Sequence, residues 1–155
     1  MSPWFRTLRR ALLAGLALAG AAGAAPVAQV EVSEAWVRAT VEGQTGSGAY
    51  MRLTSRADAQ LVGAASPVAE KVEIHEMHTV GDRMTMRQIE RLALPAGTPV
   101  ALGHGYHVML IGLRHQLLAG QQVPITLHLL DAHGARFELA LQAPVRPLGT
   151  PVPHD

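Results

Sequence analysis

Soft metal ligands gather in one segment of the chain. Four methionines and four histidines lie between positions 75 and 109: Met77, Met84, Met86 and Met109, with His75, His78, His104 and His107. Thioether sulfur is a soft, neutral ligand that holds Cu(I) and binds Zn²⁺, Mg²⁺ or Ca²⁺ poorly. The sequence has no cysteine, which excludes the His₂Cys arrangement of blue-copper sites. These residue types therefore indicate a Cu(I) site built without thiolate.

Period-two alternation places several of these side chains on common faces. The run "YHVMLIGL" at 106–113 is typical of a strand, and alternate side chains of a strand share a face, so His107 and Met109 point the same way. In "EKVEIHEMHT", the same rule separates His75 and Met77 from Ile74. Each pair is therefore free to face away from the apolar core.

A hairpin would bring the second pair close to further methionines. If "EKVEIHEMHT" and "RMTMRQIERL" form a hairpin centred between residues 80 and 81, His75 lies opposite Met86, and Met77 lies opposite Met84. Directly opposed Cβ atoms are about 4.5–5.5 Å apart, so both side chains of a pair reach one ion. With the 106–113 strand alongside, the predicted ligands are His75, Met86, His107 and Met109, with Met84 and Met77 as auxiliary ligands.

Other interpretations of the same residues remain open. A single Met in a strand is usually a core residue, and Met51 is expected to be one. An all-histidine Zn²⁺ site would use His75, His78, His104 and His107, although residues three apart in a strand face opposite ways. Catalysis is disfavoured, because the sequence has no G-x-S-x-G, no H-E-x-x-H and no thiol. We expect a binding protein and not an enzyme.

The elements that must position these ligands are short strands. Beyond residue 24 the sequence shows alternating runs broken by Gly and Pro, without a long stripe of helical period, which indicates an all-β fold. The clearest example is "VPITLHLLDAHGARFELALQ" at 123–142, where two alternating runs flank the turn "DAHG". About seven to nine such strands favour a β-sandwich or barrel.

The first 24 residues have the layout of a secretory signal peptide. Three arginines precede an apolar run, and Ala22 and Ala24 supply an A-x-A cleavage site. Removing residues 1–24 lowers Lys plus Arg from 13 to 10 against 12 Asp plus Glu, a net charge of −2. The scattered basic residues exclude a nucleic-acid partner. Without a cysteine for lipid attachment, we expect a periplasmic protein cleaved near Ala24, with no stable membrane insertion.

We therefore divide the chain into a signal peptide (1–24), one copper-binding domain (25–143) and a flexible Pro-rich tail (144–155). Three segments of that domain resemble the PCuAC family of periplasmic copper(I) chaperones: "VEIHEM", "MTMRQIERLALPAGTPVAL" and "GYHVMLIGL". The family motif is His, ten residues, Met, twenty-one residues, His, one residue, Met. Here ten residues separate His75 from Met86, and His107-x-Met109 matches the end of the motif.

The resemblance covers roughly residues 30–142 and implies a fold, a ligand and a role. The fold is a cupredoxin-like Greek-key β-sandwich or barrel. One Cu(I) per chain is held by His75, Met86, His107 and Met109. The role is that of a monomeric chaperone delivering copper to the CuA-bearing subunit of cytochrome c oxidase or to another periplasmic copper chaperone. A copper buffer or resistance protein with the same site, or a His-based Zn²⁺ or Cu(II) module, is the alternative.

The sequence departs from the family pattern in two places. Only twenty residues separate Met86 from His107, one fewer than in the motif, and the shortening falls at "LGHGYH". We expect a shorter loop that leaves the ligands in place. The tail offers only His154, so no second copper site is expected there.

Overall fold

The computed structural model describes residues 29–152, and the predicted signal peptide lies outside the described residues. Every regular element in this range is a β-strand, so none is a helix long and apolar enough to cross a membrane. The strands are β1 (Val30–Arg38), β2 (Gly46–Ser55), β3 (Ala59–Ala65), β4 (Ala69–Val80), β5 (Arg83–Ile89), β6 (Leu92–Leu94), β7 (Val100–Leu102), β8 (Tyr106–Leu113), β9 (Gln122–Leu130) and β10 (Arg136–Arg146).

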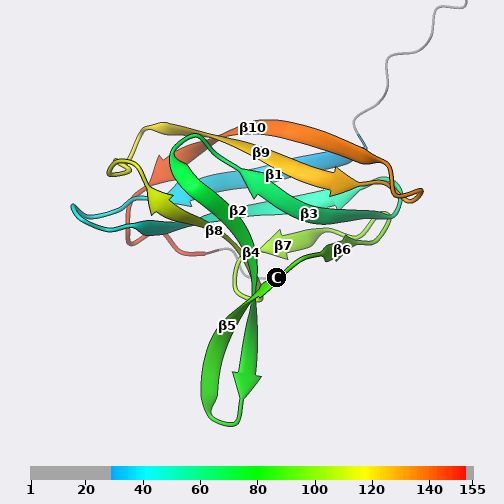
Figure 1. Ribbon diagram of the computed structural model, residues 1–155, viewed down its shortest axis with the longest axis horizontal. Coiled ribbons are helices and arrows are strands. Elements are labelled where there is room, and N and C mark those ends of the chain that lie inside the picture. Colours follow the sequence, from blue (N-terminus) through cyan, green and yellow to red (C-terminus); the bar gives the residue numbers. More distant parts are fainter. Residues whose placement is uncertain (1–28, 153–155) are drawn as a thin grey trace, which may run out of the picture.

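Seven of these strands close into a barrel (Figure 1). The order around the ring is β4-β8-β2-β1-β10-β9-β3, and the pairing of β3 with β4 closes it. Neighbours are antiparallel except β1 and β10, which run parallel. The short strands β6 and β7 pair with β3 and β2. The predicted all-β barrel is confirmed.

Alternate side chains of the ring strands fill the barrel interior. In β9, Ile125, Leu127 and Leu129 are at most 1% exposed, and Met51 of β2 is 2% exposed. The predicted β9–β10 hairpin is present, and Leu127 lies opposite Leu139. Alternate side chains of a strand point to opposite faces of the sheet. The outer faces of β2, β4 and β8 are therefore free to carry polar groups.

The β4–β5 hairpin extends beyond the barrel as an arm (Figure 1). Val80 pairs with Arg83, so the turn has two central residues. Gly81 has a φ of 60°, whereas Asp82 is not among the positive-φ positions of residues 29–152. A positive φ at the first central residue alone is typical of a type II′ turn, which favours glycine there.

This turn corrects the predicted hairpin register. Met86 lies opposite Met77, and His75 lies opposite Gln88, so the predicted direct pairs His75–Met86 and Met77–Met84 are wrong by two positions. The glycine takes the first central position of the turn, which moves its centre one residue later than assumed. A shift of two residues preserves the face of every side chain, so all three methionines of the arm still share a face with His75.

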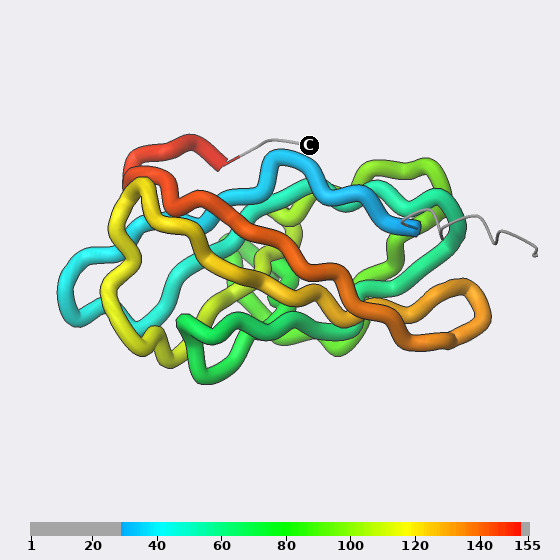
Figure 2. The backbone as a smooth tube through the Cα atoms, turned by 90° about the horizontal axis from the view of Figure 1, so that it is seen from above, coloured from blue at the N-terminus to red at the C-terminus, as the bar shows by residue number. Residues whose placement is uncertain are grey.

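The end of the chain folds back towards the first strand (Figure 2). Strand β10 continues to Arg146, and Val145 is 3% exposed, so the sheet and its core extend past the predicted domain end at residue 143. Beyond it, the Nη1 of Arg38 donates a 3.0 Å hydrogen bond to the carbonyl oxygen of Leu148. Residues 153–155, including His154, lie outside the described range.

Candidate metal centre

A row of aromatic and imidazole rings crosses the outer face of the barrel from β1 to β4. Trp36 lies opposite Tyr50, and their rings stack with centroids 4.5 Å apart. The Tyr50 ring meets His107 edge-on at 6.2 Å. His107 lies directly opposite His75. The two histidines are therefore cross-strand neighbours, at the spacing that lets both imidazoles reach one ion.

Both histidines leave a buried ring nitrogen without a hydrogen-bond partner. The Nδ1 atoms of His75 and His107 are buried and unpaired among the described residues. A buried polar atom without a partner is unfavourable by about 1–3 kcal/mol, and native proteins pair most such atoms. Two unpaired imidazole nitrogens on facing residues fit the requirements of a metal that supplies the missing bonds.

Glu73 holds the other ring nitrogen of His75. The Nε2 of His75 donates to Glu73 Oε2 at 2.8 Å, and the two side chains are 17% and 14% exposed. Hydrogen bonds from Lys71 and His75 lower the pKa of Glu73 below its usual 4.5, so Glu73 accepts as a carboxylate. A neutral His75 with its proton on Nε2 presents a free lone pair at Nδ1.

Glu73 is not among the site residues that the sequence predicts. The signal that identifies it is its position two residues before His75, which places both on the same strand face. A carboxylate bonded to the second nitrogen of a metal-ligating histidine is a common supporting contact.

The two thioethers of the predicted site border a hollow beside His107. It has a volume of about 260 Å³ and is lined by Arg38, Gln44, Gly46, Ser47, Gly48, Tyr50, Met86, His107 and Met109; we call it the Met/His hollow. His75 is not part of this lining. Met109 lies opposite Glu73 on β4, and Met86 is 50% exposed on the arm.

Three of the four predicted ligands therefore surround one hollow, and the fourth lies directly opposite His107. The His75–Met86 relation is diagonal and not direct, with a typical backbone separation of about 7–8 Å that a long side chain still spans. The auxiliary candidate Met77 lies opposite Met86, whereas Met84 is nearer the tip of the arm and 67% exposed.

Burial lowers the pKa of His107 below its usual 6.5. The nearby charges of His104, His75 and Arg38 act in the same direction. The direction of this pKa shift favours metal binding. A metal needs the neutral imidazole, and a lowered pKa keeps His107 neutral in weak acid.

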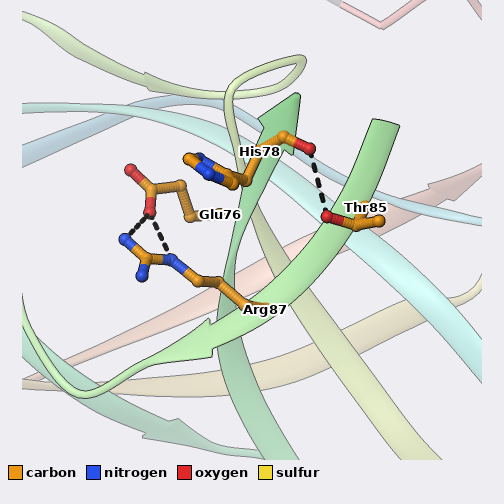
Figure 3. Close-up of polar contacts among 4 residues, drawn as sticks. All are labelled: Glu76, His78, Thr85 and Arg87. Carbon is orange, nitrogen blue, oxygen red and sulfur yellow. Dashed lines mark hydrogen bonds and ion pairs between the residues drawn. The ribbon is translucent and has the colours of Figure 1, made fainter. Parts of the chain in front are cut away.

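The fold does not bring all four histidines of the alternative Zn²⁺ site together. His78 lies on the opposite face of the arm from His75, beside Glu76, Thr85 and Arg87 (Figure 3). There Arg87 donates two hydrogen bonds to Glu76, at 2.8 and 3.0 Å, and Thr85 Oγ1 donates to the His78 carbonyl oxygen. Within residues 29–152 no group of three or more His, Asp or Glu side chains has the geometry of a metal site.

The one-residue shortening before His107 falls in a turn. Residues 103–105 connect β7 to β8, and the Gly105 carbonyl oxygen accepts a 2.8 Å hydrogen bond from the Met77 amide. Beyond this turn, β8 pairs regularly with both β2 and β4. The outward alternation of His107 and Met109 is therefore unaffected by the shorter turn.

Comparison with known proteins assigns the chain to a family. The family model described as "Putative lipoprotein LpqE-like" matches residues 30–143. A curated relative, "Putative lipoprotein Lxx21020" of Leifsonia xyli subsp. xyli (strain CTCB07), is 36% identical over 104 residues, which are 66% of this chain and 63% of the relative. The chain thus spans less than two thirds of that relative's length.

Solved structures show the same fold. The copper-bound PCuAC domain from PmoF2 matches with a TM-score of 0.61 at 21% identity, over 79% of this chain and 97% of that domain. The solution structure of Cu(I)-DR1885 from Deinococcus radiodurans matches with a TM-score of 0.54 at 32% identity, over 82% and 83%. The predicted cupredoxin-like architecture is confirmed. The chain belongs to the LpqE-like family, and its barrel is that of the PCuAC domains.

Proposed function

We propose that this protein binds one Cu(I) per chain through His75, Met86, His107 and Met109 and passes it to a partner protein. The observation that carries the proposal is the pair of facing imidazoles with unpaired buried Nδ1 atoms, next to two thioethers on the same outer face. Two neutral imidazoles and two thioethers form a soft set that favours Cu(I) over Zn²⁺. The related Cu(I)-DR1885 supports the same ligand.

The four proposed ligands differ in how their strands are held. His75, His107 and Met109 lie on barrel strands paired on both sides, whereas Met86 lies on β5, which among the described strands pairs only with β4. Glu73 keeps the proton of His75 on Nε2 so that Nδ1 faces the metal. Three ligands on strands paired on both sides and one exposed ligand on an edge strand suit a protein that must release its ion by ligand exchange.

Titration of the apo protein with Cu(I) against a chromophoric chelator tests the site. We expect one equivalent to bind, and Met109→Leu to weaken binding about tenfold or more. The matched control is Met51→Leu, the same change in the core, where Met51 is 2% exposed; it should leave affinity unchanged. Equal affinities of Met109→Leu and the wild type would overturn the ligand assignment. X-ray absorption without sulfur around copper would favour the His-based Zn²⁺ or Cu(II) module.

The proposed recipient is the CuA-bearing subunit of cytochrome c oxidase or another periplasmic copper chaperone. A deletion strain grown at low copper distinguishes this role from copper buffering. Loss of oxidase activity that added copper restores supports delivery, whereas copper sensitivity with normal oxidase activity supports a buffer or resistance role. We propose no catalytic step, because ligand exchange requires no bond making in a substrate.

We also propose export with cleavage near Ala24 and a monomeric periplasmic protein. The curated relative is described as a lipoprotein, whereas the 155 residues contain no cysteine to carry a lipid. Mass spectrometry of the periplasmic fraction identifies the mature N-terminus, and gel filtration of the same material gives its oligomeric state. Recovery in the membrane fraction would contradict the proposal.

A further inference from the structure

Arg38 places a fixed positive charge at the edge of the Met/His hollow. Its guanidinium lies 5.3 Å from the centre of the Tyr50 ring and 5.6 Å from that of Trp36. Its Nη1 donates to the Leu148 carbonyl oxygen at 3.0 Å. Two ring faces and one backbone acceptor hold this side chain in place, so the position of the charge is set by the fold.

The two aromatic rings and the backbone carbonyl that contact this arginine are all neutral. Some other basic side chains are paired with carboxylates, such as Lys71 with Glu73 at 2.7 Å and Arg87 with Glu76 at 2.8 Å. Within residues 29–152, no carboxylate lies within ion-pair distance of Arg38. The same hollow is lined by His107, Met86 and Met109, which are neutral ligands. With Cu(I) bound, the hollow would hold the charge of the ion as well as that of Arg38.

We propose that the Met/His hollow is the port through which the copper recipient inserts a negatively charged donor side chain, a thiolate or a carboxylate, guided by Arg38. This inference rests on the proposed Cu(I) site. A cationic, partly enclosed hollow concentrates anions and raises their association rate. Its volume of about 260 Å³ has room for a side chain beside the metal.

The exchange that follows replaces one ligand of copper by another without oxidation or reduction. The entering anion donates a lone pair to copper, the Met86 thioether leaves as a neutral ligand, and copper stays Cu(I). Met86 is the ligand expected to leave, because it is 50% exposed on the arm while the other three lie on the barrel. Arg38 touches neither the bond that forms nor the one that breaks; it attracts and orients the incoming anion.

Two copper acceptors of similar coordination chemistry and different charge test the inference. The loaded protein is mixed with excess bathocuproine disulfonate, which is anionic, or with neocuproine, which is neutral, and the transfer rate is followed by absorbance. In Arg38→Gln we expect transfer to the anionic acceptor to slow several-fold at low salt, and transfer to the neutral acceptor to stay within twofold of the wild type. High salt should remove the difference.

The matched control is Arg136→Gln, which removes one exposed positive charge at the start of β10 and should change neither rate. Equal slowing with both acceptors, an unchanged rate with the anionic acceptor, or a rate independent of acceptor concentration would overturn the inference. Failure of the Cu(I) site itself is distinguishable, because it would appear earlier as a wild-type protein that does not load one equivalent of copper.

Discussion

At the scale of single residues, the carboxylate beside His75 leaves one ring nitrogen available to the proposed copper ion. Glu73 accepts from Nε2 at 2.8 Å, and Nδ1 is buried without a partner among the described residues. The hydrogen bond and the unpaired atom belong to the same ring. The contact therefore favours the tautomer that the proposed site requires, and it leaves Nδ1 available as a ligand.

Removing this carboxylate should weaken copper binding without unfolding the protein. We expect Glu73→Ala to lower Cu(I) affinity about 10- to 100-fold, the usual effect of losing a partner of a metal-ligating histidine. Glu73→Gln, which keeps an acceptor oxygen, should restore much of it. Competition with a chromophoric chelator measures affinity, and ¹⁵N NMR of the apo protein reports the His75 tautomer.

The control uses the second Glu–His pair of the barrel. Glu138 contacts His128 at 3.0 Å on an exposed part of the β9–β10 hairpin, and Glu138→Ala should leave affinity and the His75 tautomer unchanged. A tighter Cu(I) complex in Glu73→Ala would mean that Glu73 competes with copper for His75, contrary to the proposed role.

The lowered pKa of His107 predicts how the apo protein responds to acid. In the folded state this imidazole protonates below 6.5 because it is buried, while in the unfolded state it protonates near 6.5. Below pH 6.5 the unfolded chain therefore binds more protons, and the free energy of unfolding falls as the pH drops towards the folded pKa. Above that window His107 contributes no pH dependence.

Urea denaturation of the apo protein between about pH 7.5 and 5 measures this effect. We expect stability to decline across the window in the wild type and to decline less in His107→Gln. The Glu73 pKa is lowered from 4.5, so its own stabilising effect is lost only at more acidic pH. A wild-type protein that gains stability as the pH falls from 6.5 would contradict the assignment.

At the scale of elements, the arm is held in register by one turn. Its two central residues are Gly81, with φ at 60°, and Asp82. The register sets which arm residue lies nearest the proposed ligands on the barrel, so the turn positions Met86 from five residues away. Within the described sheet, β5 pairs with β4 alone, so little else holds this part of the arm.

Substituting the turn glycine should affect copper more than folding. Gly81→Ala forces a side chain into a strained φ, at a cost of about 1–3 kcal/mol. The arm lies outside the barrel core, so we expect a small change in melting temperature and a several-fold loss of Cu(I) affinity. Calorimetry and chelator competition measure the two effects.

The matched control is Gly134→Ala in the β9–β10 turn. Gly134 has a φ of 80°, and, as at Gly81, an added Cβ would meet no atom within 4 Å. This substitution carries the same backbone strain in a hairpin of the barrel, so it should lower the melting temperature and leave copper affinity unchanged. Unchanged affinity in Gly81→Ala would show that the turn does not position Met86.

At the scale of the whole molecule, the barrel is a rigid support whose interior and exterior are chemically separate. Leu127 and Val108 face the core. His107, which lies between Tyr106 and Val108 in the sequence, faces outwards. Closure by the β3–β4 pairing leaves the site strands β4, β8 and β2 paired on both sides. Core packing and copper binding should therefore respond to different substitutions.

A core truncation tests this separation. Leu127→Ala removes a fully buried side chain, and we expect the free energy of unfolding to fall by about 2–5 kcal/mol. The fraction that remains folded should still bind one Cu(I) with wild-type affinity. The exposed Leu118, 51% accessible, provides the control: Leu118→Ala should change stability by less than about 0.5 kcal/mol. Loss of copper affinity in folded Leu127→Ala would contradict the separation.

The sequence by itself determined which types of metal ligand are available and on which face of its strand each one lies. Its His and Met residues, its lack of cysteine and its period-two alternation predicted an all-β fold and a soft site on the outer face. Those features depend on composition and on the parity of a strand, which are local. The β9–β10 hairpin was predicted for the same reason, because its turn and both of its strands are contiguous in the chain.

Only the tertiary structure decided which residues meet. It placed His75 directly opposite His107, moved the arm register by two positions and brought Arg38 and Tyr50 to the hollow. Cross-strand register depends on the conformation of one turn, and the neighbours of β8 depend on how distant strands close the barrel. Residue spacing encodes neither, because the turn can be centred at either of two adjacent positions and the neighbours of β8 come from segments that are far apart along the chain.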